Sequence, residues 1–130
     1  MRLSISELQT RIEKLDENLN CCKLCGFECG VKRNQGKLGR CGASSDVYIS
    51  TIGKHYGEGP KLAGYYGAGT IFFSYCNASC VFCQNYQLSH EGLGEKVPIE
   101  KLAKMMLVLE RNGCVNIDLI SPTHYVPQII

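Results

Sequence analysis

The chain has 130 residues, of which 45% are hydrophobic and 20% charged, a composition typical of a single globular domain. Its formal net charge is +2, and the charges are spread along the chain, so electrostatics predict neither nucleic-acid nor membrane binding. The N-terminus lacks the apolar run of a signal peptide, and no window approaches the ~18 apolar residues of a membrane-spanning helix, so we expect a cytoplasmic protein.

The N-terminal segment predicts a helix. Ser4 and Glu7 have the spacing of a capping box, and apolar residues recur at helical intervals from Ile5 to Leu19. We therefore expect a helix over residues 5–19 whose apolar stripe packs on the body of the protein.

Residues 20–46 are rich in cysteine and glycine and show little periodicity, which favours a segment held together by metal rather than by an apolar core. The chain has nine cysteines, and in a reducing cytosol this abundance points to metal or cluster ligation instead of disulfides. A short strand over residues 47–51 and a glycine-rich connection over residues 53–69 follow.

Beyond residue 69 the pattern is strand, loop, helix, strand. Residues 70–74 are β-branched and aromatic, Pro98 suits a first helical position, Gly113 suits a helix end, and residues 115–120 read as a buried strand. A βαβ unit with two parallel strands is expected. Three cysteines follow its first strand and Ser121-Pro-Thr-His124 follows its second, so these two loops should lie side by side.

The spacing of the three cysteines is C-x3-C-x2-C, over Cys76, Cys80 and Cys83. Structural zinc takes four protein ligands, whereas three thiolates on one loop can hold three irons of a [4Fe–4S] cube and leave the fourth iron open. A zinc loop or an incidental group of cysteines is the alternative interpretation.

An earlier group of cysteines has the spacing C-x2-C-x3-C-x11-C, which is enough to close either a zinc site or an auxiliary iron–sulfur cluster. The sequence does not separate these metals. Its members are Cys22, Cys25, Cys29 and Cys41, with Cys21 as an alternative first ligand. Cys114 stands apart at the junction of a helix and a strand, where a small buried hydrophobe is expected.

Three stretches together resemble the radical S-adenosylmethionine (SAM) superfamily, in the branch similar to pyruvate formate-lyase activating enzyme. They are "GTIFFSYCNASCVFCQNYQLS", "NIDLISPTHYVPQI" and "CKLCGFECGVKRNQGKLGRCG", and the resemblance spans residues 20–130. The match favours Cys22 over Cys21. In this superfamily the open iron chelates SAM, and an electron from the cluster cleaves it to a 5′-deoxyadenosyl radical inside an enclosing barrel.

The resemblance assigns residues by position. Cys76, Cys80 and Cys83 would ligate the cluster, and Phe82 would lie near the adenine of SAM. Superfamily members often carry a Gly-Gly-Glu-like motif after the second strand; this chain has Ser121-Pro-Thr-His124 there, so Thr123 and His124 become the expected cofactor-binding residues. A His124 that only satisfies backbone groups is the alternative.

The implied activity is that of a radical SAM enzyme with SAM and a reductant such as flavodoxin or ferredoxin as partners, and with a glycyl-radical protein as the protein it activates. Neither a membrane nor a nucleic acid is expected as a partner. The alternative function is a noncatalytic zinc-binding module, either structural or nucleic-acid-binding.

The expected fold is α/β. An N-terminal helix and cysteine-rich metal-binding module over residues 1–52 should precede, over residues 53–130, the first βαβ unit of an incomplete radical SAM (TIM-like) barrel. A full barrel takes about 250 residues. We therefore expect the chain to be the N-terminal part of a longer protein, and the sequence leaves the substrate open because one fold serves many reactions.

Overall fold

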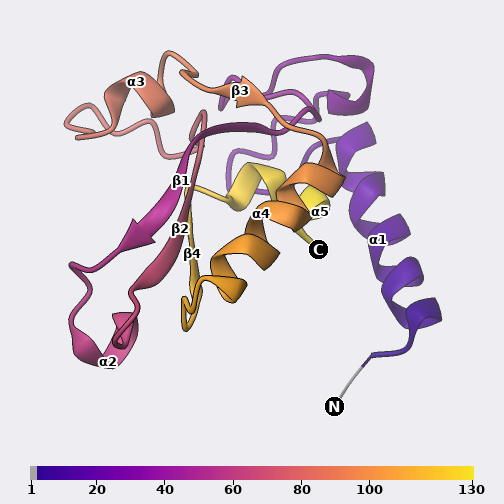
Figure 1. Cartoon of the computed structure of the whole chain (residues 1–130). Coiled ribbons are helices and arrows are strands. Elements are labelled where there is room, and N and C mark those ends of the chain that lie inside the picture. Colours follow the sequence, from indigo (N-terminus) through magenta and orange to yellow (C-terminus); the bar gives the residue numbers. More distant parts are fainter. Residues whose placement is uncertain (1–2) are drawn as a thin grey trace.

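The structure, a computed structural model, describes residues 3–130 and places an N-terminal helix beside a four-stranded mixed sheet (Figure 1). The strand order is β3-β1-β2-β4, with β1 antiparallel to both of its neighbours and β2 parallel to β4. Within residues 3–130 the sheet is open and does not close into a barrel. The strands are β1 (Tyr48–His55), β2 (Ala68–Phe73), β3 (Glu95–Lys96) and β4 (Ile117–Ile120).

The helices differ greatly in length. Two of them, α1 and α4, run for several turns, and the remainder are single turns that shape the loops. The α-helices are α1 (Ile5–Asn20), α2 (Pro60–Ala63), α3 (Tyr86–Ser89), α4 (Ile99–Arg111) and α5 (Val126–Ile129), and the 3-10 turns are η1 (Arg33–Gln35) and η2 (Thr123–Tyr125). No helix within the described residues is both long and apolar enough to cross a bilayer.

The capping box predicted for α1 is confirmed. The hydroxyl of Ser4 accepts a hydrogen bond from the backbone N–H of Glu7, and the Glu7 carboxylate accepts one from the backbone N–H of Ser4. The predicted packing of its apolar stripe on the body of the protein is confirmed at Leu19, which is buried, but not at Ile5, which is 76% exposed. The reason is that α1 contacts α5 and η1, whereas its first turn stands to the side of the sheet, as Figure 1 shows.

The βαβ unit is confirmed. β2 and β4 pair in parallel, with Ile71 opposite Leu119, and α4 connects them across one face of the sheet. The apolar face of α4 buries Leu102 and Leu109 against the strands, and Cys114 lies buried in the same cluster, as predicted for a small hydrophobe. Burial of this face is what fixes the two parallel strands in register.

The glycine-rich connection is shorter than predicted. β1 continues to His55 and β2 begins at Ala68, and these two residues are paired in the antiparallel ladder. The strand was expected to stop near residue 51, but ladder hydrogen bonds need no side chain, so Gly53 and Gly69 take part in the sheet. β1 also runs through the domain boundary predicted at residue 52, and that division stays a prediction.

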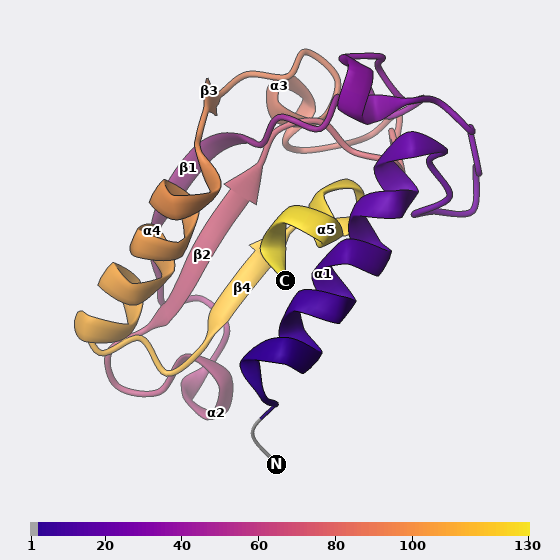
Figure 2. The ribbon, with the colours of Figure 1, turned by 90° about the vertical axis from the view of Figure 1, so that its right-hand side faces the viewer.

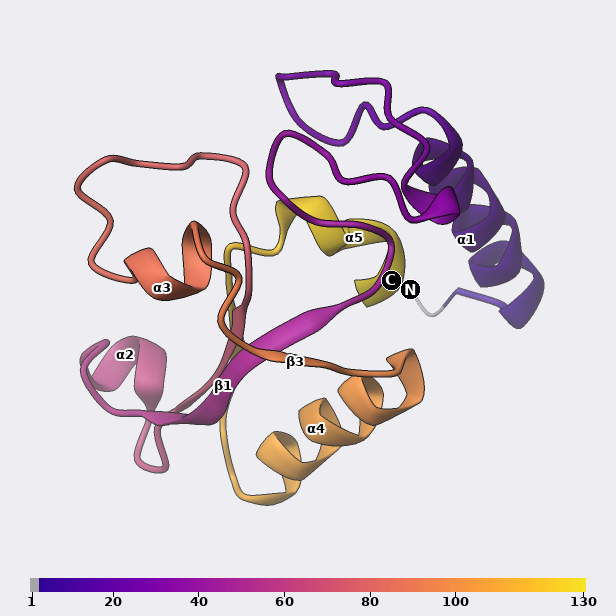
Figure 3. The same ribbon diagram turned by 90° about the horizontal axis from the view of Figure 1, so that it is seen from above.

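Both cysteine-bearing segments lie at the same end of the sheet, the end to which β2 and β4 point. In Figure 2 the loop carrying α3 and the segment between α1 and β1 meet above the sheet, and Figure 3 shows α5 lying between them. The carboxyl ends of the two parallel strands thus face the N-terminal cysteine segment.

We predict that Gly94→Ala destabilises the fold by about 1–3 kcal/mol, because a methyl group there has no space. A Cβ on Gly94 would lie 2.8 Å from the carbonyl oxygen of Ile49 and would also collide with the hydroxyl of Ser74. The free energy of unfolding in urea measures this loss. Gly53→Ala is the matched control, since its Cβ would meet nothing within 4 Å and should change stability by less than about 0.5 kcal/mol. Equal losses in the two variants would contradict the steric explanation.

Candidate functional site

The loop that follows β2 carries three cysteines in different environments. Tyr75 begins it with a positive φ of 67°, which turns the chain sharply out of the strand. Cys76 and Cys83 are half-buried, whereas Cys80 between them is exposed. The loop therefore has two anchored ends and an open tip.

Cys76 is held by hydrogen-bond donors from both loops. The backbone N–H of Ala78 donates to its Sγ at 3.4 Å, the N–H of Ser79 also contributes, and the side-chain hydroxyl of Ser121 donates from the loop after β4. Burial alone would raise the pKa of Cys76, but these donors outweigh it and hold the pKa below its usual value. The expected meeting of the two loops is confirmed at this thiol, and the donors favour its thiolate form.

The other end of the loop is anchored by α3. The hydroxyl of Ser89 lies 3.3 Å from Sγ of Cys83, and the same hydroxyl lies 2.7 Å from Nδ1 of His90. The rings of Tyr86 and His90 stack, with centroids 4.3 Å apart and planes inclined by 11°. One helical turn thus fixes the position of Cys83.

The open tip of the loop is apolar. Phe82 is 87% exposed and Val81 is 90% exposed, beside the exposed Cys80. Exposed large apolar side chains next to a free thiol mark a surface that gains by being covered. Phe82 is thus free to approach a ligand bound at this loop, and its predicted contact with adenine stays a prediction.

His124 lies beneath the loops and is 2% exposed. Its Nε2 bonds the carbonyl oxygen of Ser74 at 3.0 Å, while within the described residues its buried Nδ1 has no partner. Burial, together with the nearby Arg33, lowers the pKa of His124 to about 4, although the bond to Ser74 acts in the opposite direction. This geometry matches the alternative interpretation, in which His124 only satisfies backbone groups. Thr123 is half-buried beside it in η2.

Two of the N-terminal cysteines, Cys29 and Cys41, lie on either side of Gly39. A Cβ on Gly39 would lie 3.3 Å from Sγ of Cys41 and 3.7 Å from Sγ of Cys29, so the absence of a side chain leaves room between these two thiols. The Cys22 side chain hydrogen-bonds Cys29, and Cys22 is 5% exposed. Cys25 lies half-buried in the preceding turn.

Two of these thiols differ in their acidity. Backbone N–H donors, first that of Arg40, hold the pKa of Cys29 below its usual value, whereas burial raises the pKa of Cys41. Cys21 is exposed, whereas the Cys22 side chain bonds Cys29, so the geometry favours Cys22 as the member of this group.

Arg33 is the residue that sequence reasoning missed. It is fully buried, and its guanidinium donates to the carbonyl oxygens of Ser44 and His124, with Nη1 also 4.0 Å from Sγ of Cys22. The same cysteine- and glycine-rich segment contains Arg40, which is exposed, and no sequence signal separates the two arginines. Ser121 was signalled by its place after the second strand, but the bond from its hydroxyl to Cys76 was not.

The residues fit thiolate-bound metal in their chemistry, although their positions are not those of a closed site. Among residues 3–130, no three histidine, cysteine or acidic side chains converge in an arrangement that could hold a metal ion. The donors around Cys76 favour a thiolate ligand, and the room at Gly39 lies between two thiols. Metal binding would therefore require the thiols within each cysteine group to move closer together, as is common when metal binding and folding are coupled.

Comparison with known proteins found one curated relative, the uncharacterized protein MJ0674 of Methanocaldococcus jannaschii. The two sequences are 33% identical over 91 residues, which make up 70% of this chain and 25% of the relative. The matched part is thus a quarter of that protein's length. No family profile matches the chain, and no solved structure matches it.

We predict that Ser121→Ala raises the pKa of Cys76 and slows its alkylation near neutral pH by a factor of about three, because one donor to the thiolate is lost. Peptide mass spectrometry of the reduced, metal-free chain after a short iodoacetamide pulse measures the rate. Ser79→Ala is the control, since the Ser79 hydroxyl donates to the Cys76 carbonyl and the variant keeps the backbone donors to the thiol. A similar slowing in both variants would contradict the role of Ser121.

We also predict that burial of His124 makes the fold acid-sensitive. Its pKa falls from 6.5 to about 4 on folding, so the unfolded chain binds the proton more tightly and stability is lost as pH falls through this window. The loss should reach about 3 kcal/mol between pH 7 and pH 4. Urea unfolding at several pH values measures it.

Two variants isolate the contribution of His124. His124→Gln should lose less stability than the wild type over the same range of pH. His55→Gln, which removes an exposed ring paired with Glu58, should follow the wild-type profile. If the wild type and His124→Gln have parallel profiles, then His124 is not the group responsible.

Proposed function

We propose that this chain is part of a radical SAM iron–sulfur enzyme in which Cys76, Cys80 and Cys83 ligate a [4Fe–4S] cluster. The observation that carries the proposal is the environment of Cys76. Its thiol lies just after the carboxyl end of β2 and accepts a hydrogen bond from the hydroxyl of Ser121, which follows β4. Both loops of the parallel βαβ unit thus meet at one proposed cluster ligand. Donors to a ligating sulfur stabilise the thiolate and tune a cluster.

The rest of the loop supports the same assignment. Cys83 accepts from Ser89, and Cys80 is exposed at the tip, so the third thiol is free to move toward the other two. The C-x3-C-x2-C spacing provides three thiolates for a four-iron cube, which leaves one iron for SAM. When bound, such a cluster supplies the electron that cleaves SAM to a 5′-deoxyadenosyl radical.

The chain's own residues would bind SAM and exclude water from it. Phe82, which is exposed beside Cys83, would cover the adenine. Thr123 lies where the loop after β4 faces the cysteine loop, and His124 acts from below by holding the carbonyl of Ser74. A reductant such as flavodoxin or ferredoxin and a glycyl-radical protein are the proposed partners.

The proposal includes a description of the complete fold. The parallel pair β2–β4 with α4 would be the first βαβ unit of an incomplete TIM-like barrel. The matched part makes up 25% of the relative from Methanocaldococcus jannaschii, so that protein extends far beyond it. Further βα units in the complete enzyme would enclose the site.

A second candidate function is a noncatalytic zinc-binding module, which the contacts among the N-terminal thiols favour: Cys29 and Cys41 lie beside Gly39, and the Cys22 side chain bonds Cys29. Within the proposed enzyme the same cysteines, with Cys25, would form a second metal site that holds zinc or an auxiliary cluster. The two functions predict different metals at Cys76, Cys80 and Cys83. Anaerobically purified protein should be brown and contain iron and sulfide for the enzyme, and colourless with zinc for the module.

We predict that Cys80→Ala abolishes the SAM-responsive cluster. Two thiolates leave a second iron of the cube without a protein ligand, so about four irons per chain should be lost after anaerobic reconstitution. The electron paramagnetic resonance spectrum of the reduced protein, recorded with and without SAM, measures the cluster. An assay for 5′-deoxyadenosine reports whether the 130-residue chain cleaves SAM by itself.

Cys25→Ala is the matched control, since it removes one thiol from the other group. It should loosen the N-terminal segment through the coupling of metal binding to folding, yet keep a spectrum that shifts with SAM. If Cys80→Ala keeps that shift while Cys25→Ala loses it, the cluster belongs to the N-terminal cysteines and the assignment is wrong.

A further inference from the structure

Arg33 is a buried cation whose partners are all uncharged in the described structure. Its Nε and Nη2 donate to the carbonyl of Ser44, at 3.2 and 2.5 Å, and its Nη1 donates to the carbonyl of His124 at 2.5 Å. The guanidinium also lies over the ring of Tyr125, 5.9 Å from its centroid. The ion pairs found in residues 3–130 are His55–Glu58 and Lys96–Asp46, neither of which involves Arg33.

A buried charge without a counter-charge is costly, so a buried arginine calls for an anion. One candidate is a thiolate at Cys22, whose Sγ lies 4.0 Å from Nη1. Cys22 in turn hydrogen-bonds Cys29 and lies near Cys41. Four thiolates around one Zn²⁺ carry a net charge of −2, which is the charge complement that Arg33 lacks.

The same guanidinium connects this group to the second cysteine loop. Its bond to the carbonyl of His124 holds η2, and Nε2 of His124 bonds the carbonyl of Ser74, two residues before Cys76. The series of contacts therefore runs from Cys22 through Arg33 and His124 to the start of the cluster loop. All of its members except Cys76 are buried.

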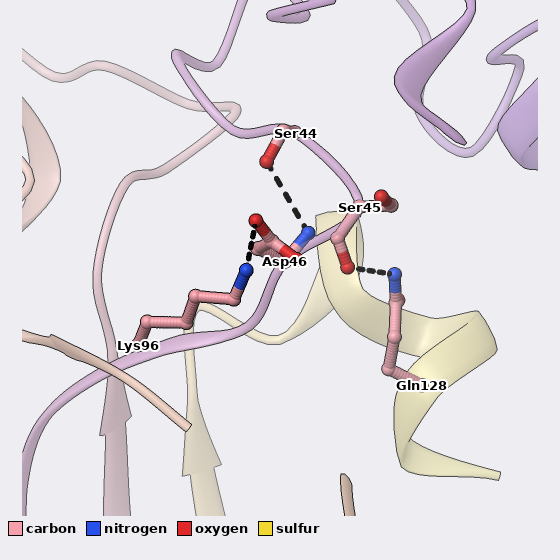
Figure 4. Close-up of polar contacts among 5 residues, drawn as sticks. All are labelled: Ser44, Ser45, Asp46, Lys96 and Gln128. Carbon is pink, nitrogen blue, oxygen red and sulfur yellow. Dashed lines mark hydrogen bonds and ion pairs between the residues drawn. The ribbon is translucent and has the colours of Figure 1, made fainter. Parts of the chain in front are cut away.

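The segment that receives Arg33 is itself tied to the rest of the fold (Figure 4). The side-chain amide of Gln128 in α5 donates to the carbonyl of Ser45, and Lys96 in β3 pairs with Asp46. The carbonyl of Ser44 that accepts from Arg33 therefore belongs to a segment with contacts to both α5 and β3.

We propose that Arg33 couples the two cysteine groups: it supplies the counter-charge to a metal–thiolate site that includes Cys22 and, through His124, transmits occupancy of that site to the loop of Cys76. Arg33 is a positioning residue in this arrangement. The inference rests on the proposed function only for the identity of the cluster at the Cys76 loop. The coupling itself depends on metal binding by the N-terminal thiols. By linkage, order at the Cys76 loop favours metal at the N-terminal site to the same degree.

The test uses the full chain with Cys80→Ala as background, so that the second loop has two cysteines and does not compete for metal. Zn²⁺ affinity is measured by competition with a chromogenic chelator, and Co²⁺ substitution reports thiolate ligation by its absorption. Hydrogen exchange of the amides of residues 121–126 is measured with and without Zn²⁺. With Arg33 present, Zn²⁺ should slow this exchange about fivefold or more.

Two substitutions separate the charge of Arg33 from its geometry. Arg33→Met should weaken Zn²⁺ binding by about 10–100-fold and abolish the exchange response. Arg33→Lys keeps the charge but not the planar fork, so it should retain Zn²⁺ affinity within about threefold and still lose the response. Arg40→Met is the matched control, because Arg40 is exposed in the same segment with its guanidinium over Phe27, and both readouts should stay at the background values.

The lysine variant keeps the test decisive if Arg33→Met does not fold. An unchanged exchange response in Arg33→Lys would overturn the coupling, and equal loss of Zn²⁺ affinity in Arg33→Met and Arg40→Met would overturn the counter-charge. Neither readout involves SAM or a four-iron cluster. A failure here is therefore distinguishable from a failure of the radical SAM assignment, which the resonance spectra test.

Discussion

The parallel pairing of β2 and β4 is the constraint on which the arrangement of this protein depends. Parallel neighbours need a crossover, and α4 provides it by burying Leu102 and Leu109 against the sheet. Because both strands point the same way, the loops that follow them must emerge at one edge. The contact of Ser121 with Cys76 is a direct consequence of that pairing.

A residue from outside the βαβ unit, Arg33, also contacts this edge of the sheet. Arg33 belongs to the cysteine-rich segment before β1, the first strand of the chain. Its guanidinium is nevertheless buried against η2, which follows the last strand, β4. Main-chain carbonyls of Ser44 and His124 accept its hydrogen bonds, so the contact places no demand on side chains other than the arginine itself. A fully buried guanidinium fixes position well because its donors form a rigid planar fork.

The sequence predicted the regular elements of the fold because their signals are local. The capping box of α1, the periodicity of α4 and the β-branched residues of β2 and β4 each depend on a few neighbouring positions. The exposed start of α1, the pairing of β1 up to His55 and the burial of Arg33 depend on partners far away in the chain. The candidate site divides in the same way: the spacing of the cysteines was readable, whereas the donors from Ser121 and Ser89 were not.

The two cysteine groups differ in how much of their geometry the protein fold supplies. At Gly39 two thiols, those of Cys29 and Cys41, already lie close, with backbone donors at Cys29 and a cation beside Cys22. In the loop after β2, the fold fixes Cys76 and Cys83 and leaves Cys80 exposed. Ordering that tip costs conformational entropy, which metal–thiolate bonds must offset. Contacts that hold the base of the loop, such as the bond from His124 to Ser74, lower that cost, since less of the loop remains to be ordered.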